Sequence, residues 1–136
     1  MPIGKARVRR QGRDVTITAH SRMVAHAMKA AEELEKDGID AEVIDLRTLR
    51  PLDTATIVES VKKTNRLVTV EEGWGQSGVG AEVAARVALE AFDYLDAPPT
   101  RVHQVDAPLA YAANLEALAL PSVEKVIEAV KAVTYR

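Results

Sequence analysis

The amino-acid sequence predicts an α/β domain in which helices cover both faces of a mainly parallel sheet. Short β-branched, apolar runs alternate along the chain with segments whose apolar residues recur at helical spacing. The connections between successive runs are too long for hairpins and contain a helix, as parallel strands require. The 136 residues show no internal repeat, low-complexity run or linker. Residues 1–136 are therefore predicted to form a single domain.

Five segments have the composition of strands. The second alternates β-branched Val15 and Ile17 with threonines, and the third and fourth are short apolar runs bounded by polar residues. Strands are predicted at residues 7–10, 14–19, 41–46, 67–70 and 101–105. The first two strands are joined across Gly12, so the sequence also allows them to pair as an antiparallel hairpin at one edge of the sheet.

Four segments have the apolar spacing of amphipathic helices. Helices are predicted at residues 22–36, 53–63, 79–94 and 122–133. Ser21, Asp53 and Ser122 stand where an N-cap side chain would accept a bond from the first turn. Gly38 is expected to end the first helix, because glycine readily adopts the left-handed conformation of a helix stop.

Composition indicates a globular domain but no activity. Hydrophobic residues make up 47% and charged residues 28% of the chain, and the net charge is −2. That charge disfavours bulk electrostatic binding to nucleic acid or to an anionic membrane. The chain has no cysteine and only three dispersed histidines, which excludes disulfides and thiolate metal sites and makes a histidine-rich site implausible. No stretch approaches 18 apolar residues and no secretory signal is visible.

The first 13 residues are the one strongly charged segment. They contain five basic residues and no acid: Lys5, Arg7, Arg9, Arg10 and Arg13. A nucleic-acid-binding arm is one interpretation. An exposed edge strand kept from pairing by its charge is favoured, because no aromatic residues are interleaved to stack on bases.

A glycine-rich motif follows the fourth predicted strand. Gly73, Gly75 and Gly78 form a G-x-G-x-x-G pattern before a helix, and Asp106 follows the next strand. Such a pattern can bind a dinucleotide phosphate at the helix N-terminus. However, the motif lies in the third strand-to-helix turn, and Glu71 and its neighbour place two negative charges beside it. Nucleotide binding therefore remains the alternative, and a loop–helix junction that packs against a partner is favoured.

Three other polar residues lie near predicted strand ends. Arg47 and Arg50 flank a loop and could clamp a carboxylate or phosphate, but a structural role, tying that loop to Asp45, Asp53 or Glu71, is favoured. His20 could act as an acid or base, yet spacing identifies no partner for it. No complete catalytic constellation or metal site is predicted.

Six strings in order carry a specific resemblance. They are residues 14–17 (DVTI), 41–53 (AEVIDLRTLRPLD), 63–74 (KTNRLVTVEEGW), 78–82 (GVGAE), 95–98 (LDAP) and 111–115 (YAANL). Together they resemble the C-terminal domain of the beta subunit of the first component of pyruvate dehydrogenase. The branch is the alpha-proteobacterial and mitochondrial one, and more broadly the chain resembles the transketolase C-terminal domain.

The resemblance implies a three-layer α/β/α sandwich around a mixed five-stranded sheet with one antiparallel edge strand. It implies a non-catalytic domain that contacts a second beta subunit and the alpha subunit and docks onto the subunit-binding domain of the dihydrolipoyl acyltransferase. Asp96 and the C-terminal Arg136 are the positions carried over for docking, and Trp74 and Gln76 are carried over for the subunit interface. The parent would be an oxidoreductase using thiamine diphosphate and magnesium, both bound outside this chain, in a bacterial cytoplasm or mitochondrial matrix.

The chain also departs from the family pattern. Gly75 and Ala110 stand where the family usually has proline, and Thr134 stands where this branch often has cysteine. Met1 precedes a position that lies in the middle of family members, which suggests an excised or redesigned domain. These departures affect the partner-facing loops more than the fold.

Overall fold

The computed structural model describes residues 4–74, 78–104 and 121–135. In chain order the elements alternate, after one additional strand at the start, between strand and helix. They are β1 (Arg7–Arg10), β2 (Val15–Ala19), α1 (Met23–Lys36), β3 (Ala41–Asp45), α2 (Thr54–Thr64), β4 (Leu67–Trp74), α3 (Val79–Ala91), a 3₁₀ turn (Phe92–Tyr94), β5 (Thr100–Gln104) and α5 (Val123–Thr134). Within the described residues, no helix has both the length and the apolar character needed to span a membrane.

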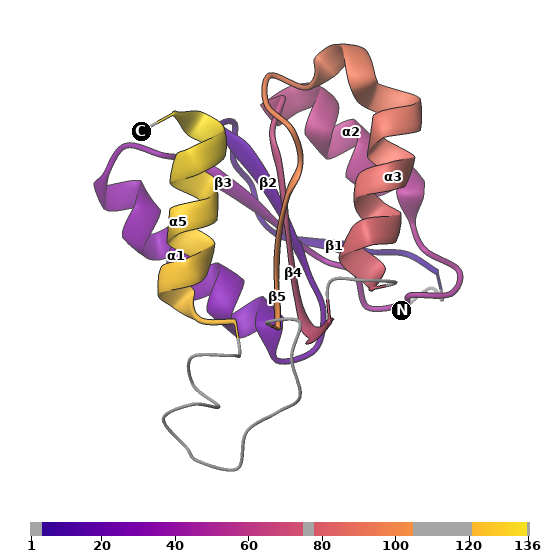
Figure 1. Cartoon of the computed structure of the whole chain (residues 1–136), viewed down its shortest axis with the longest axis horizontal. Helices are drawn as coiled ribbons and strands as arrows, with labels where there is room; N and C mark the ends of the chain where they lie inside the picture. Colours follow the sequence, from indigo (N-terminus) through magenta and orange to yellow (C-terminus); the bar gives the residue numbers. More distant parts are fainter. Residues whose placement is uncertain (1–3, 75–77, 105–120, 136) are drawn as a thin grey trace.

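The sheet has five strands in the order β1-β3-β2-β4-β5 (Figure 1). β2, β3, β4 and β5 pair in parallel, and β1 pairs antiparallel with the outer side of β3. The mixed, mainly parallel sheet with one antiparallel edge is thus confirmed. The hairpin between the first two strands is wrong, because β2 already has a parallel neighbour on each side, and β1 can bond only to the free edge of β3.

Helices α1 and α5 cover one face of the sheet, and α2 and α3 cover the other (Figure 1). Each side has its own apolar core. Leu34 and Val130 belong to the larger core under α1 and α5, whereas Ile57 and Val87 belong to the core under α2 and α3. The alternation of side chains along the strands feeds both cores. It leaves Thr16 on the second face, where its hydroxyl bonds to helix α2.

Local sequence explains most helix ends. Asp53 accepts a bond from the Thr56 backbone N–H, Ser122 accepts one from the Lys125 N–H, and Gly38 takes a positive φ of 78°. The predicted Ser21 cap is wrong. Ser21 itself has a left-handed φ of 57°, and α1 begins after Arg22 without a side-chain cap bond.

Candidate docking site

Asp96 lies in the segment between the 3₁₀ turn and β5, at the edge of the sheet where β4 begins. Its backbone is held from two sides: its N–H donates to the Asn65 carbonyl at 2.8 Å, and its carbonyl accepts from the Tyr135 hydroxyl at 3.3 Å. Its side chain is 58% exposed, and Oδ2 lies 3.9 Å from Nη2 of Arg66. The carboxylate is therefore fixed in place by its backbone and is still accessible to a cation from outside.

Arg66 connects Asp96 to the rest of this edge. Its Nε donates to the carbonyl of Val133 near the end of α5, and its Nη1 donates to the carbonyl of Asp14 just before β2, both at 3.1 Å. The fork geometry of a guanidinium allows one side chain to serve several acceptors at once. Asp96 and the last turn of α5 consequently both contact the Arg66 side chain.

The turn before Arg66 follows from its sequence. Asn65 ends α2 with a left-handed φ of 65°, a conformation that asparagine tolerates better than most residues. Its side-chain Nδ2 donates to the Tyr94 carbonyl at 2.7 Å, and the Lys62 ammonium lies 5.4 Å from the centre of the Tyr94 ring. The end of α2 thus fastens the 3₁₀ turn that leads into Asp96.

The glycine motif begins at the opposite ends of the strands, where β4 finishes. Gly73 lies in β4, one residue before its end, and Gly78 is the N-cap residue of α3 and has an extended backbone. The carboxylate of Glu71, which is 4% exposed, accepts the Gly80 N–H at 3.2 Å. A Cβ at Gly80 would lie 2.5 Å from the Thr69 hydroxyl, so helix and strand are in close contact here.

Glu71 therefore uses one of the N–H groups of this helix start that a phosphate would need, and it adds a negative charge beside the others. This arrangement weighs against a dinucleotide at the start of α3.

Comparisons with known proteins identify the family of this fold. The profile described as transketolase, C-terminal domain matches residues 4–126. The chain belongs to the transketolase C-terminal domain family. The described residues of this transketolase C-terminal domain also superpose on a split-gene transketolase, titled an inactive beta4 tetramer. That match has a TM-score of 0.87 and 31% identity, and it covers 99% of this chain and 44% of that one.

Three relatives with high sequence identity are all pyruvate dehydrogenase E1 component beta subunits. The chain is 59% identical over 136 residues to the pyruvate dehydrogenase E1 component subunit beta of Rhizobium meliloti, covering 100% of this chain and 30% of that protein. It is 57% identical to the mitochondrial protein of the same name from Dictyostelium discoideum, covering 100% and 38%. It is 60% identical to the Rickettsia conorii protein, covering 99% and 41%. The domain thus spans less than half the length of each of these relatives, and the resemblance seen in the sequence is confirmed.

The structure of this transketolase C-terminal domain brings together only some of the residues singled out from the sequence. Asp96 lies beside the end of α5, where the Tyr135 hydroxyl donates to its carbonyl. Arg136, Gly75, Gln76 and Asp106 lie outside the described residues, and for Trp74 the backbone alone is described, in β4.

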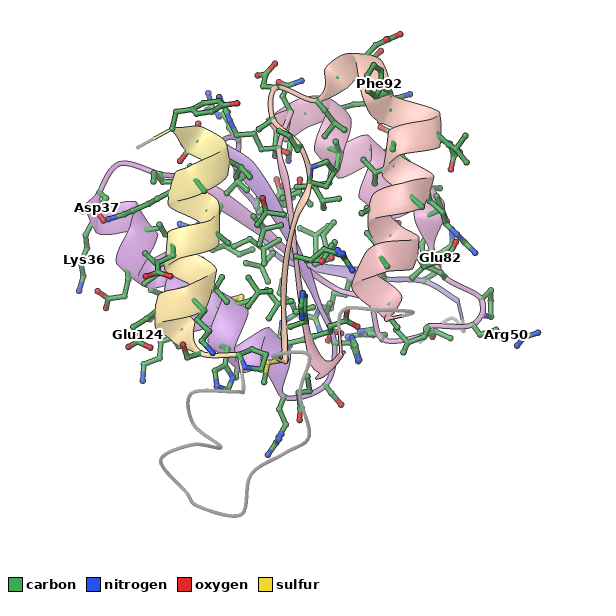
Figure 2. The ribbon with its side chains drawn as sticks, viewed as in Figure 1. Lys36, Asp37, Arg50, Glu82, Phe92 and Glu124 are labelled. Carbon is green, nitrogen blue, oxygen red and sulfur yellow. The ribbon has the colours of Figure 1, made fainter. Side chains whose placement is uncertain are left out.

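The other three polar candidates do not form a shared site. Arg47 turns back onto its own loop, with Nε 4.0 Å from Oδ2 of Asp45, as the structural interpretation expected. Arg50 is exposed and projects away from the molecule (Figure 2). His20 lies at the end of β2, and its buried Nδ1 has no hydrogen-bond partner among the described residues. Nor do the described residues include any group of three histidine, aspartate or glutamate side chains arranged to hold a metal ion.

Sequence reasoning missed two ion pairs of this domain. Arg66 was not singled out, although it contacts Asp96, the end of α5 and the residue before β2. Arg22 and Glu72 form a two-bonded pair at the opposite edge, at 3.0 and 2.5 Å. The hydrogen bond and charge of Arg22 lower the pKa of Glu72, and Glu72 in turn raises the pKa of Arg22. Partners separated by 50 residues leave no local signal in one sequence.

Proposed function

We propose that this domain is a non-catalytic assembly and docking module of a pyruvate dehydrogenase beta subunit. The proposed partner is the subunit-binding domain of the dihydrolipoyl acyltransferase, bound through Asp96 and Arg136. One observation carries the docking proposal: Asp96 is fixed by its backbone, exposed at its carboxylate and adjacent to the last turn of α5. Association with a second beta subunit and with the alpha subunit belongs to the same proposal, with Trp74 and Gln76 at that interface.

The parent reaction would be pyruvate decarboxylation with acetyl transfer to a lipoyl group, in a bacterial cytoplasm or mitochondrial matrix. Thiamine diphosphate supplies the electron sink for that decarboxylation when bound. The described residues of this chain do not fit the cofactor and its magnesium, because they include no cluster of metal-ligating side chains and α3 begins against Glu71. We therefore place both groups on other parts of the parent assembly.

Removing the charge of Asp96 tests the docking proposal. Asp96→Asn is expected to weaken binding of the cognate subunit-binding domain by about 3- to 10-fold, since an exposed charge pair contributes about 1 kcal/mol. The salt dependence of the affinity should also decrease, because one charge contact is lost. Titration calorimetry at two salt concentrations measures both effects, and the melting temperature should stay nearly unchanged.

A matched control is available for this variant. Asp37 is 54% exposed and pairs with Lys131 across two elements at 3.2 Å, much as Asp96 pairs with Arg66. Asp37→Asn should leave the affinity for the subunit-binding domain unaltered. Equal affinities for the wild-type chain and the Asp96→Asn variant would contradict the proposal.

A further inference from the structure

A mainly apolar hollow adjoins Asp96. It has a volume of about 590 Å³ and lies between the end of α3 and the segment that leads into β5. Its lining includes Phe92, Leu95, Ala97 and Pro98 together with the acids Asp93 and Asp96. Pro98 and Pro99 fix their own φ angles, and the backbone of Asp96 is bonded on both sides. The walls of this hollow are therefore held in place before anything binds.

One side of the hollow continues into an exposed apolar ridge. Leu89 is 86% exposed and Phe92 is 70% exposed, and among the large apolar side chains of the described residues only Tyr135, at 72%, has a value in the same range. They lie three residues apart, a spacing that places two side chains on one side of a helix end. Figure 2 shows Phe92 where α3 ends. Two large exposed apolar side chains beside a hollow form a contiguous apolar patch, and such patches often mark interaction sites.

The charge of the lining indicates what kind of partner fits. Among the described residues, those that line the hollow include two acids, Asp93 and Asp96, and no base. Arg66 approaches the Asp96 carboxylate at 3.9 Å and leaves it 58% exposed. Glu90, which follows Leu89 in the sequence, is a third exposed acid, and Arg86, three residues before Leu89, is paired with Glu82. A second copy of this chain would bring the same acids against each other, whereas a basic segment would find opposite charges around an apolar centre.

We infer that this hollow receives an apolar side chain from a basic segment of the docking partner, while lysines or arginines beside that side chain pair with Asp93 and Asp96. The inference rests on the proposed docking function and adds an apolar anchor to its charge contact. Buried apolar anchors at the centre of an interface contribute more affinity than exposed rim charges. Asp96 then mainly accelerates and orients binding, and Phe92 mainly slows release.

Two variants test the anchor, one that shortens a side chain lining the hollow and one that fills the hollow. The probe is the cognate subunit-binding domain. Phe92→Ala is expected to weaken binding about 10-fold through faster dissociation, with an unchanged salt dependence. Ala88→Trp, which fills the hollow from its exposed wall, should weaken binding at least as much without removing any contact of the folded chain. Leu49→Ala is the control, because Leu49 is also an exposed large apolar residue, at 40%, and lies on a different loop.

Surface plasmon resonance at two salt concentrations separates the outcomes. If Phe92→Ala and Ala88→Trp bind like wild type while Asp96→Asn binds weakly, the anchor is wrong and the docking proposal stands. If no variant changes the affinity, both fail. Light scattering provides the last check: a dimer of the wild-type chain that Phe92→Ala converts to a monomer, with the partner affinity unchanged, would assign the hollow to a second copy and overturn the inference.

Discussion

Replacing Gly12 by valine is expected to lower the free energy of unfolding by at least about 3 kcal/mol, a large part of the stability of a domain this size. Gly12 is buried where the chain passes from β1 to β2 across the start of β3. A Cβ at this position would lie 2.4 Å from the carbonyl carbon of Ala41 and 2.6 Å from the Glu42 nitrogen. These are backbone atoms of a paired strand, so they cannot move aside as a flexible side chain would.

The same substitution disturbs a partly buried ion pair. The Gly12 N–H donates to Oε1 of Glu42 at 3.1 Å, and the same carboxylate, on a residue only 3% exposed, pairs with Lys63. Urea unfolding followed by circular dichroism measures the loss. The exposed neighbour Gln11 provides the control, since Gln11→Ala should change the free energy of unfolding by less than about 0.5 kcal/mol. A Gly12→Val variant within 1 kcal/mol of wild type would show that the β1–β2 crossing adapts more than the structure implies.

Replacing Asp53 by alanine is expected to lower the free energy of unfolding by about 2 kcal/mol at neutral pH. The Asp53 carboxylate accepts three bonds: from the Thr56 N–H at 3.2 Å, from the Thr56 hydroxyl at 2.6 Å and from the Ala6 N–H at 2.9 Å. It therefore caps α2 and also attaches the segment before β1. Asp53 is 7% exposed, so water cannot fully replace these bonds in the variant.

The effect of this variant should depend on pH. Burial alone raises the pKa of Asp53, but the bonds from Thr56 and Ala6 and the charge of Lys5 lower it more, so the pKa lies below its ordinary value. A carboxylate with a lowered pKa in the folded state stabilises that state fully above the unfolded pKa of about 4. The stabilisation declines as the pH falls through that value towards the folded pKa.

The difference between wild type and Asp53→Ala should thus be largest from pH 5 to pH 7 and shrink below about pH 4. Unfolding curves at several pH values measure it. Asp53→Asn keeps an oxygen acceptor without a titrating group, so its difference from Asp53→Ala should hardly change with pH. A gap between wild type and Asp53→Ala that widens with acidification would contradict the lowered pKa.

Patterns local in the sequence were enough to predict most of the fold. The β-branched runs around Val15 and Ile17 became strands, and Asp53 and Ser122 became caps, because each depends on neighbours a few residues away. The pairing of β1 could not be read in this way. A turn at Gly12 allows a hairpin locally, and only the competition of β3 and β4 for the two sides of β2 excludes it.

Less of the candidate site than of the fold could be predicted from the sequence. Asp96 came from a family resemblance, and no pattern pointed to Arg66, whose two carbonyl acceptors and one carboxylate partner come from distant parts of the chain. The exposure of Phe92 was equally hidden. Phe92 follows Leu89 by three residues, and an apolar pair at this spacing is equally compatible with a core-facing stripe, although both side chains are exposed in the structure.

The three contacts of Arg66, two hydrogen bonds and one ion pair, have a consequence for cooperativity. The last turn of α5 cannot fray without losing the bond from Arg66 to Val133, and that loss loosens the guanidinium that also faces Asp96. The last turn of α5 and the segment that holds Asp96 are therefore expected to open together rather than as two independent surface segments. Amide hydrogen exchange in the final turn of α5 and at Asp96 should accordingly slow together when a partner occupies either one.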